Sequence, residues 1–200
     1  MPTSQQNDLD FSLLPSVDVG RTFWSLPPEI STGIENYPET LLRAKAAVHF
    51  CRLPPYPERT GDENLRLREA YLRAALGEFV TMEETLRSDC PTTNPRRIVD
   101  SRNPLLHIIK QLRNLQFHLQ TSTLTPEQQR VLFMGDEHDM DIYYIGDLEI
   151  TDFDKLNDAR RYKDSDKIQM LAWFNESQRV WGTADLVRRA VEAFASEIAT

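Results

Sequence analysis

The sequence is poor in cysteine and in long apolar runs, and each shortage excludes a class of protein. Cys51 and Cys90 are the only cysteines among 200 residues, and neither belongs to a C-x-x-C pair, so we expect reduced thiols and no cysteine zinc site. No stretch approaches the roughly 18 apolar residues of a membrane-spanning helix. Residues 1–16 lack the basic and apolar regions of a secretory signal. These absences predict a cytoplasmic protein that binds no membrane.

Several catalytic motifs are also missing. The sequence has no glycine-rich phosphate loop, no G-x-S-x-G, no H-E-x-x-H and no EF-hand spacing. Nucleotide-dependent, hydrolase-triad and redox chemistries therefore have no support, and we expect neither a cofactor nor a bound metal.

The formal net charge of −8 lies within one segment of the chain. Residues 136–158 contain nine acidic residues and one base, Lys155, whereas the remainder contains 22 acidic and 22 basic residues. An acidic protein does not coat nucleic acid nonspecifically. The segment is typical of a solvated acidic turn, but it could also contact a basic protein partner, mimic nucleic acid, or bind a divalent cation through residues 136–141.

Proline positions and apolar spacing predict a mainly α fold. We expect an irregular, proline-rich arm over 1–38 and a single helical-bundle domain of four to six helices over 39–200, with an acidic β insert at about 131–158. The strand-like residues of that insert predict a small hairpin within 131–151. A further helical turn is expected from Thr125. The predicted helices cover about 39–53, 62–88, 104–121, 166–181 and 183–199.

Two predicted helices differ in the residues of their apolar faces. In the helix at 104–121, leucine and isoleucine recur at alternating spacings of three and four, which is typical of a core face. In the first helix the corresponding face is mixed, and it places His49 among apolar neighbours as an expected core histidine. The face of the helix at 104–121 comprises Leu105, Ile108, Leu112, Leu115 and Leu119. The face of the first helix comprises Leu42, Ala46, His49 and Leu53.

The other side of the helix at 104–121 carries a polar face made of His107, Gln111, Asn114 and His118. It contains two imidazoles and two amides but no acid, whereas solvated helix faces normally use lysine and glutamate. The pattern predicts a face that meets a partner helix or an anionic ligand, unless it is a solvent face that happens to hold histidines.

The segment from Arg113 to His118 reads R-N-L-Q-F-H and resembles the R-N-x(3)-H motif of HEPN domains. That superfamily comprises helical bundles that include metal-independent ribonucleases, many of them toxins or defence effectors. The resemblance covers about 40–120 and 183–199. It departs from one subfamily, which has tyrosine where this chain has Gln120, so no role of that tyrosine carries over.

The resemblance implies RNA cleavage by attack of a 2′-hydroxyl on the adjacent phosphorus. His118 would serve as base or acid, Arg113 would clamp the scissile phosphate, and Asn114 would hold the phosphate or orient the imidazole. Helix-face geometry alone adds His107 as a second proton-transfer group. Because Arg113 and His118 lie about 140° apart around an ideal helix, one straight helix cannot aim both at one atom. HEPN nucleases are typically dimers with composite sites, so the resemblance implies a homodimer that acts on RNA.

Two other functions remain open from the sequence. A noncatalytic helical module, HEPN-like or unrelated, would bind another protein through the polar face and the acidic insert. A metal-dependent enzyme would use the acidic residues 136–141.

Overall fold

The computed structural model describes residues 7–17, 33–52, 61–91, 95, 97–118, 124–133 and 136–199. Within these ranges the chain is mainly helical and includes one small antiparallel sheet, as the sequence predicts. The elements in chain order are η1 (Phe11–Leu13), α1 (Pro38–Arg52), α2 (Gly61–Asp89), η2 (Ile98–Asp100), α3 (Pro104–His118), β1 (Thr125–Phe133), β2 (Asp136–Tyr144), α4 (Ile150–Asp154), η3 (Asn157–Arg161), α5 (Asp164–Trp181) and α6 (Thr183–Ile198).

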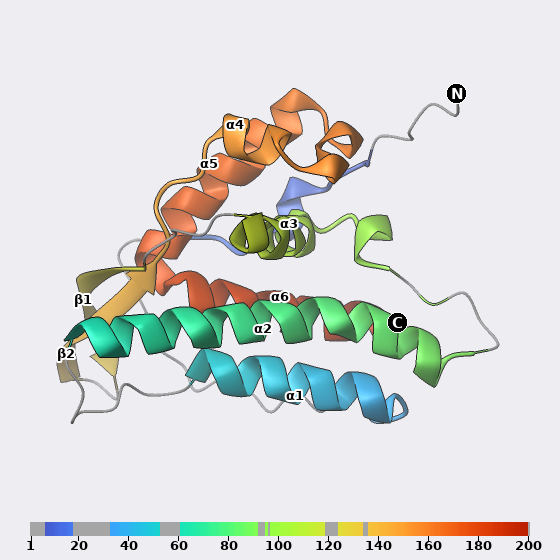
Figure 1. The fold of residues 1–200 in the computed structure, drawn as a ribbon, viewed down its shortest axis with the longest axis horizontal. Helices are drawn as coiled ribbons and strands as arrows, with labels where there is room; N and C mark the ends of the chain where they lie inside the picture. The colour runs from blue at the N-terminus through green and yellow to red at the C-terminus, as the bar shows by residue number, and fades with distance from the viewer. Residues whose placement is uncertain are drawn as a thin grey trace.

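Helices α1, α2, α3 and α6 form the body of the bundle. Figure 1 shows α1 running antiparallel along α2, with α6 behind them and α3 above. Helix α6 contacts all three, and Phe194 of α6 meets Phe79 of α2 edge to face, with their ring centroids 6.3 Å apart. Both phenylalanines are fully buried, so this pair lies at the centre of the core.

The leucine and isoleucine face predicted for α3 is confirmed. Leu105, Ile108, Leu112 and Leu115 are all at most 2% exposed, while Leu119 lies outside the described residues. Asn103 caps the helix, since its Oδ1 accepts a hydrogen bond from the Leu105 N–H at 3.0 Å. The spacing of apolar residues therefore predicted both the position and the inward side of this helix.

The face predicted for α1 is wrong. Leu42 is 57% exposed and His49 is also exposed, so His49 is not a core histidine. The helix instead buries the side chains of Thr40, Ala44, Ala47 and Val48. Small side chains let α1 approach α2 closely, and that closeness is not apparent from hydrophobicity alone.

The β insert is shorter and begins earlier than predicted. Thr125 starts strand β1 rather than a helical turn, and β1 pairs antiparallel with β2 in a register that places Thr125 opposite Tyr144. In a two-stranded sheet each strand is an edge, so Pro126 can occupy β1 although it has no N–H to donate. The expected insert extends to about residue 158, but residues 150–154 form α4 and η3 begins at Asn157.

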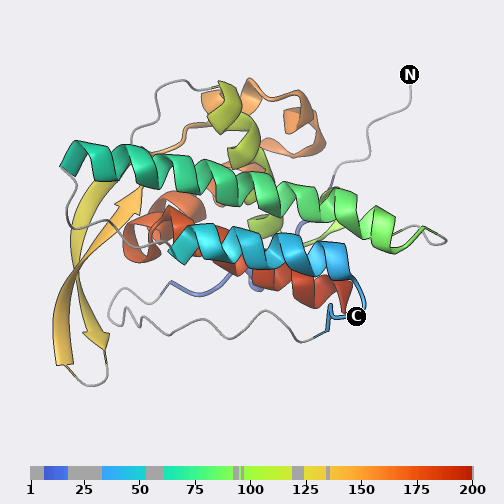
Figure 2. The ribbon, with the colours of Figure 1, turned by 60° about the horizontal axis from the view of Figure 1, so that its bottom comes forward.

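The base of the hairpin is anchored where α5 ends and α6 begins, and its far end extends beyond the bundle (Figure 2). The Ile145 N–H donates to Gln178 Oε1 and to Thr183 Oγ1, both at 3.2 Å. Gly182 is the N-cap residue of α6. Gly182 has φ +79° and ψ 152°, a conformation that is essentially restricted to glycine.

Substitution of Gly182 tests this anchor. An added Cβ would lie 3.2 Å from the Tyr143 carbonyl oxygen in a strained backbone conformation, so we expect Gly182→Ala to lower the free energy of unfolding by about 1–3 kcal/mol. Gly77→Ala is the matched control. It adds a methyl group in open space within α2 and should raise the same free energy by about 0.5–1 kcal/mol. Urea unfolding measures the free energy of unfolding of both variants. Equal changes of the same sign would contradict the role of Gly182 in anchoring the hairpin.

Candidate functional site

The first two residues of the predicted polar face, His107 and Gln111, lie in the interior, so the expectation that this face meets a ligand is wrong for these two residues. His107 and Gln111 are both 0% exposed. The His107 Nε2 lies 2.8 Å from the Ser101 carbonyl oxygen, and its Nδ1 lies 3.0 Å from the Tyr162 hydroxyl. His107 therefore does not present a proton-transfer group at the surface of this chain.

Tyr162 covers this part of the polar face and was missed by sequence reasoning. It follows η3, some fifty residues after α3, and is 4% exposed. Its ring meets the His107 ring edge to face, with centroids 5.5 Å apart, and also packs against Phe153 of α4. No spacing in the sequence links Tyr162 to α3, so the contact became visible only in the fold.

The HEPN-like motif lies in the C-terminal half of α3. Arg113 and Asn114 are half-buried, and Arg113 Nη1 lies 3.4 Å from Asn114 Oδ1. Asn114 Nδ2 in turn lies 3.4 Å from Gln111 Oε1. His118 ends the helix, and its side chain lies outside the described residues. The structure therefore places these two consecutive residues, Arg113 and Asn114, at the border between core and solvent.

Burial lowers the pKa of His107, although its hydrogen bond with the Ser101 carbonyl opposes the change. The neutral imidazole is thus favoured in the folded state, while the unfolded chain takes up a proton below about pH 6.5. We expect the free energy of unfolding to fall as the pH drops below that value, by at most about 1.4 kcal/mol per pH unit.

Denaturant unfolding between pH 7 and pH 5 measures this dependence. His107→Gln should reduce the slope of stability against pH, because it removes the titrating imidazole. An unchanged slope in the His107 variant would show that this histidine does not carry the effect.

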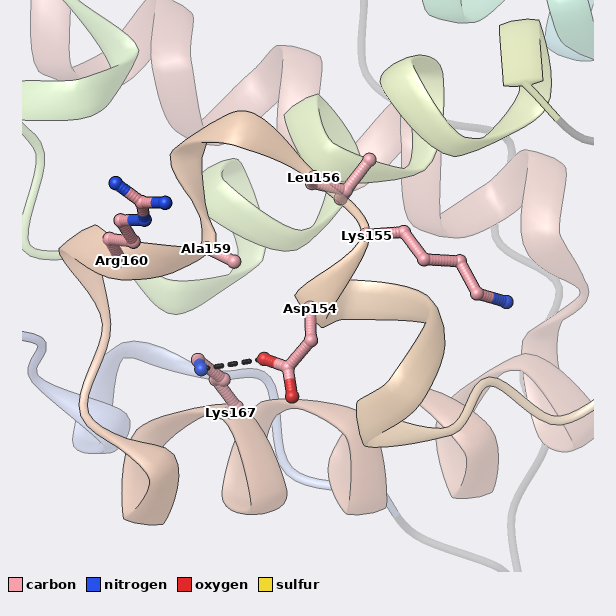
Figure 3. Close-up of a pocket in the computed structure, with 6 residues that line it drawn as sticks. All are labelled: Asp154, Lys155, Leu156, Ala159, Arg160 and Lys167. Atoms are coloured by element: carbon pink, nitrogen blue, oxygen red, sulfur yellow. Dashed lines mark hydrogen bonds and ion pairs between the residues drawn. The ribbon is translucent and has the colours of Figure 1, made fainter.

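A cavity of about 380 Å³ lies between α4, η3 and the start of α5 (Figure 3). The Lys167 ammonium group lies 2.8 Å from an Asp154 carboxylate oxygen and 2.9 Å from one of Asp164. These two carboxylates already neutralise the Lys167 ammonium group, so this buried cation is not left for a ligand. Its lining contains none of the four residues predicted for RNA cleavage: it comprises Asp154, Lys155, Leu156, Ala159, Arg160 and Lys167.

The acidic hairpin residues are exposed and do not converge on one point. Asp139 and Glu137 each lie 3.6 Å from Arg130 across the sheet. Because side chains alternate along a strand, Asp136 is on the opposite face of β2 from Glu137, Asp139 and Asp141. Among the residues described, no group of three or more histidine, cysteine, aspartate or glutamate side chains is arranged to hold a metal ion.

Comparisons of the chain with protein-family models, with curated proteins and with solved structures give no match. Within the described part of the chain, no helix combines the length and the apolar character needed to cross a membrane. A function must therefore be argued from the motif and its surroundings.

Proposed function

We propose that the protein is a HEPN-like, metal-independent endoribonuclease of toxin or defence type, whose site forms at the C-terminal half of α3. The observation that supports this proposal best is the placement of Arg113 and Asn114. They are adjacent, half-buried and within 3.4 Å of one another, where α3 passes from the core towards solvent. An arginine guanidinium is suited by its charge and planar donor geometry to bind a phosphate.

RNA cleavage of this kind needs a base for the 2′-hydroxyl and an acid for the leaving 5′-oxygen. His118 supplies one imidazole. Because His107 is sealed in the core, it does not supply the other. In a two-fold dimer that pairs the ends of α3, the second imidazole is His118 of the partner subunit. The Arg113 guanidinium then stabilises the charge that develops on the phosphorane oxygens.

The test is incubation of the purified protein with structured RNA in excess EDTA. The proposal predicts cleavage, with 2′,3′-cyclic phosphate at the new ends. The same preparation run on a size-exclusion column should elute as a dimer. Intact RNA after incubation, or products with 3′-hydroxyl ends, would reject the proposed chemistry.

A second function is favoured by the hairpin. It extends from the bundle and exposes Asp136, Glu137, Asp139 and Asp141, with Arg130 paired to two of them. This surface suits a basic protein partner. This function would be supported if the purified protein leaves RNA intact and binds a lysine-rich peptide with an affinity that falls as the salt concentration rises. Charge reversal at Asp139 and Asp141 should then weaken binding, and unchanged affinity would rule the surface out.

A further inference from the structure

A chain of hydrogen-bonding contacts runs from the interior to the motif on α3. It passes from the Ser101 carbonyl through His107, Tyr162 and Gln111 to Asn114 and Arg113. We propose that His107 and Tyr162 are positioning residues, which orient the Asn114 amide towards Arg113 through this chain. The inference rests on the proposed function, because it assigns these buried groups to the nuclease site.

The donor-to-acceptor direction of these hydrogen bonds is fixed at the inner end, at His107. A backbone carbonyl only accepts hydrogen bonds, so the His107 Nε2, 2.8 Å from the Ser101 oxygen, must carry the proton. In the neutral imidazole, Nδ1 is then an acceptor. The Tyr162 hydroxyl at 3.0 Å donates to it, and the Asn7 amide nitrogen at 3.5 Å, which can only donate, faces the same atom. Both contacts of Nδ1 thus agree with the tautomer that is protonated at Nε2.

The outer links follow from that tautomer. Since the Tyr162 proton is used on His107, its oxygen accepts from Gln111 Nε2 at 3.4 Å. The Gln111 Oε1 is therefore left to accept from Asn114 Nδ2, also at 3.4 Å. This contact turns the Asn114 Oδ1 towards the Arg113 Nη1. A reversed Asn114 amide would place two donors together at Arg113 and two acceptors together at Gln111.

Burial makes this orientation specific. His107 and Gln111 are fully buried and Tyr162 is nearly so, and a buried polar group without a partner is costly. The links at 3.4 Å are longer than an ideal hydrogen bond, so each contributes modestly. These hydrogen-bonding contacts therefore bias the orientation of the Asn114 amide.

Tyr162→Phe removes the hydroxyl and keeps the ring that packs against His107 and Phe153. We expect kcat for RNA cleavage in EDTA to fall about five- to tenfold with little change in KM, because the loss of one neutral hydrogen bond is of that order. Tyr143→Phe is the matched control. Its half-buried ring faces Arg68, outside the chain of contacts, and kcat should not change.

Nuclear magnetic resonance provides a readout that does not depend on cleavage. Ring ¹⁵N shifts of the wild-type protein should show a protonated Nε2 and an unprotonated Nδ1 on His107. The side-chain amide signal of Asn114 should shift in Tyr162→Phe and stay in place in Tyr143→Phe. A protonated Nδ1, or an Asn114 signal equally unmoved in both variants, would overturn the inference. If these signals behave as expected but the protein does not cleave RNA, only the proposed function is rejected.

Discussion

Arg113→Ala lowers the rate of RNA cleavage about a thousandfold while the fold persists, if the guanidinium stabilises the phosphorane. Arg113 is half-buried beside Asn114, so its truncation removes a positioned cation rather than a core side chain. Arg113→Lys keeps the charge but loses the planar fork of donors, and it should recover only part of the rate. Initial rates on one structured RNA, measured in EDTA at saturating substrate, provide the comparison.

The matched control for this prediction is Arg160→Ala. Arg160 is an exposed arginine in η3 that lines the separate cavity, and its loss should leave the rate unchanged. A similar fall in both variants would reflect a general loss of positive charge. An unchanged rate in Arg113→Ala would remove Arg113 from the site.

Mixed dimers should be inactive if each site uses His118 from both subunits. When wild-type chains and a fourfold excess of His118→Ala chains are unfolded together and refolded, one fifth of all chains are wild type. Only about 4% of dimers then carry two intact chains, so activity should fall to about 4% of that of an all-wild-type sample. Sites contained within single chains would retain about 20%.

This mixing experiment needs proof that subunits exchange. Two tags of different mass on the two chains, followed by native mass spectrometry, show the fraction of mixed dimers. With exchange complete, an activity that follows the wild-type fraction linearly would contradict the composite site. The proposed mechanism would then need another proton-transfer group within one chain.

The apolar pattern predicted the central helices because their inward residues are large. Leu112 of α3, Phe79 of α2 and Phe194 of α6 are each at most 1% exposed. On α1, by contrast, the inward residues are small, and a pattern weighted by hydrophobicity selected Leu42, which is exposed. Size and closeness of packing, rather than apolar character, decided which side of α1 is buried.

The polar face of α3 could be predicted as unusual but not as buried. Its cover includes Tyr162, which is brought there by the short elements α4 and η3, and the sequence had predicted a β insert over the residues of α4. A contact made across some fifty residues has no local signature. The environment predicted for His107 was therefore wrong, whereas the roles predicted for Arg113, Asn114 and His118 stay predictions.

Cleavage of RNA in excess EDTA by the wild-type protein, compared with His118→Ala purified by the same procedure, tests the central claim most directly. The account predicts cyclic phosphate ends from the wild-type protein and a rate at least a hundredfold lower from the variant, about the contribution of a proton-transfer group. Equal rates in the two preparations would contradict it, because the cleavage would then come from another site or another protein.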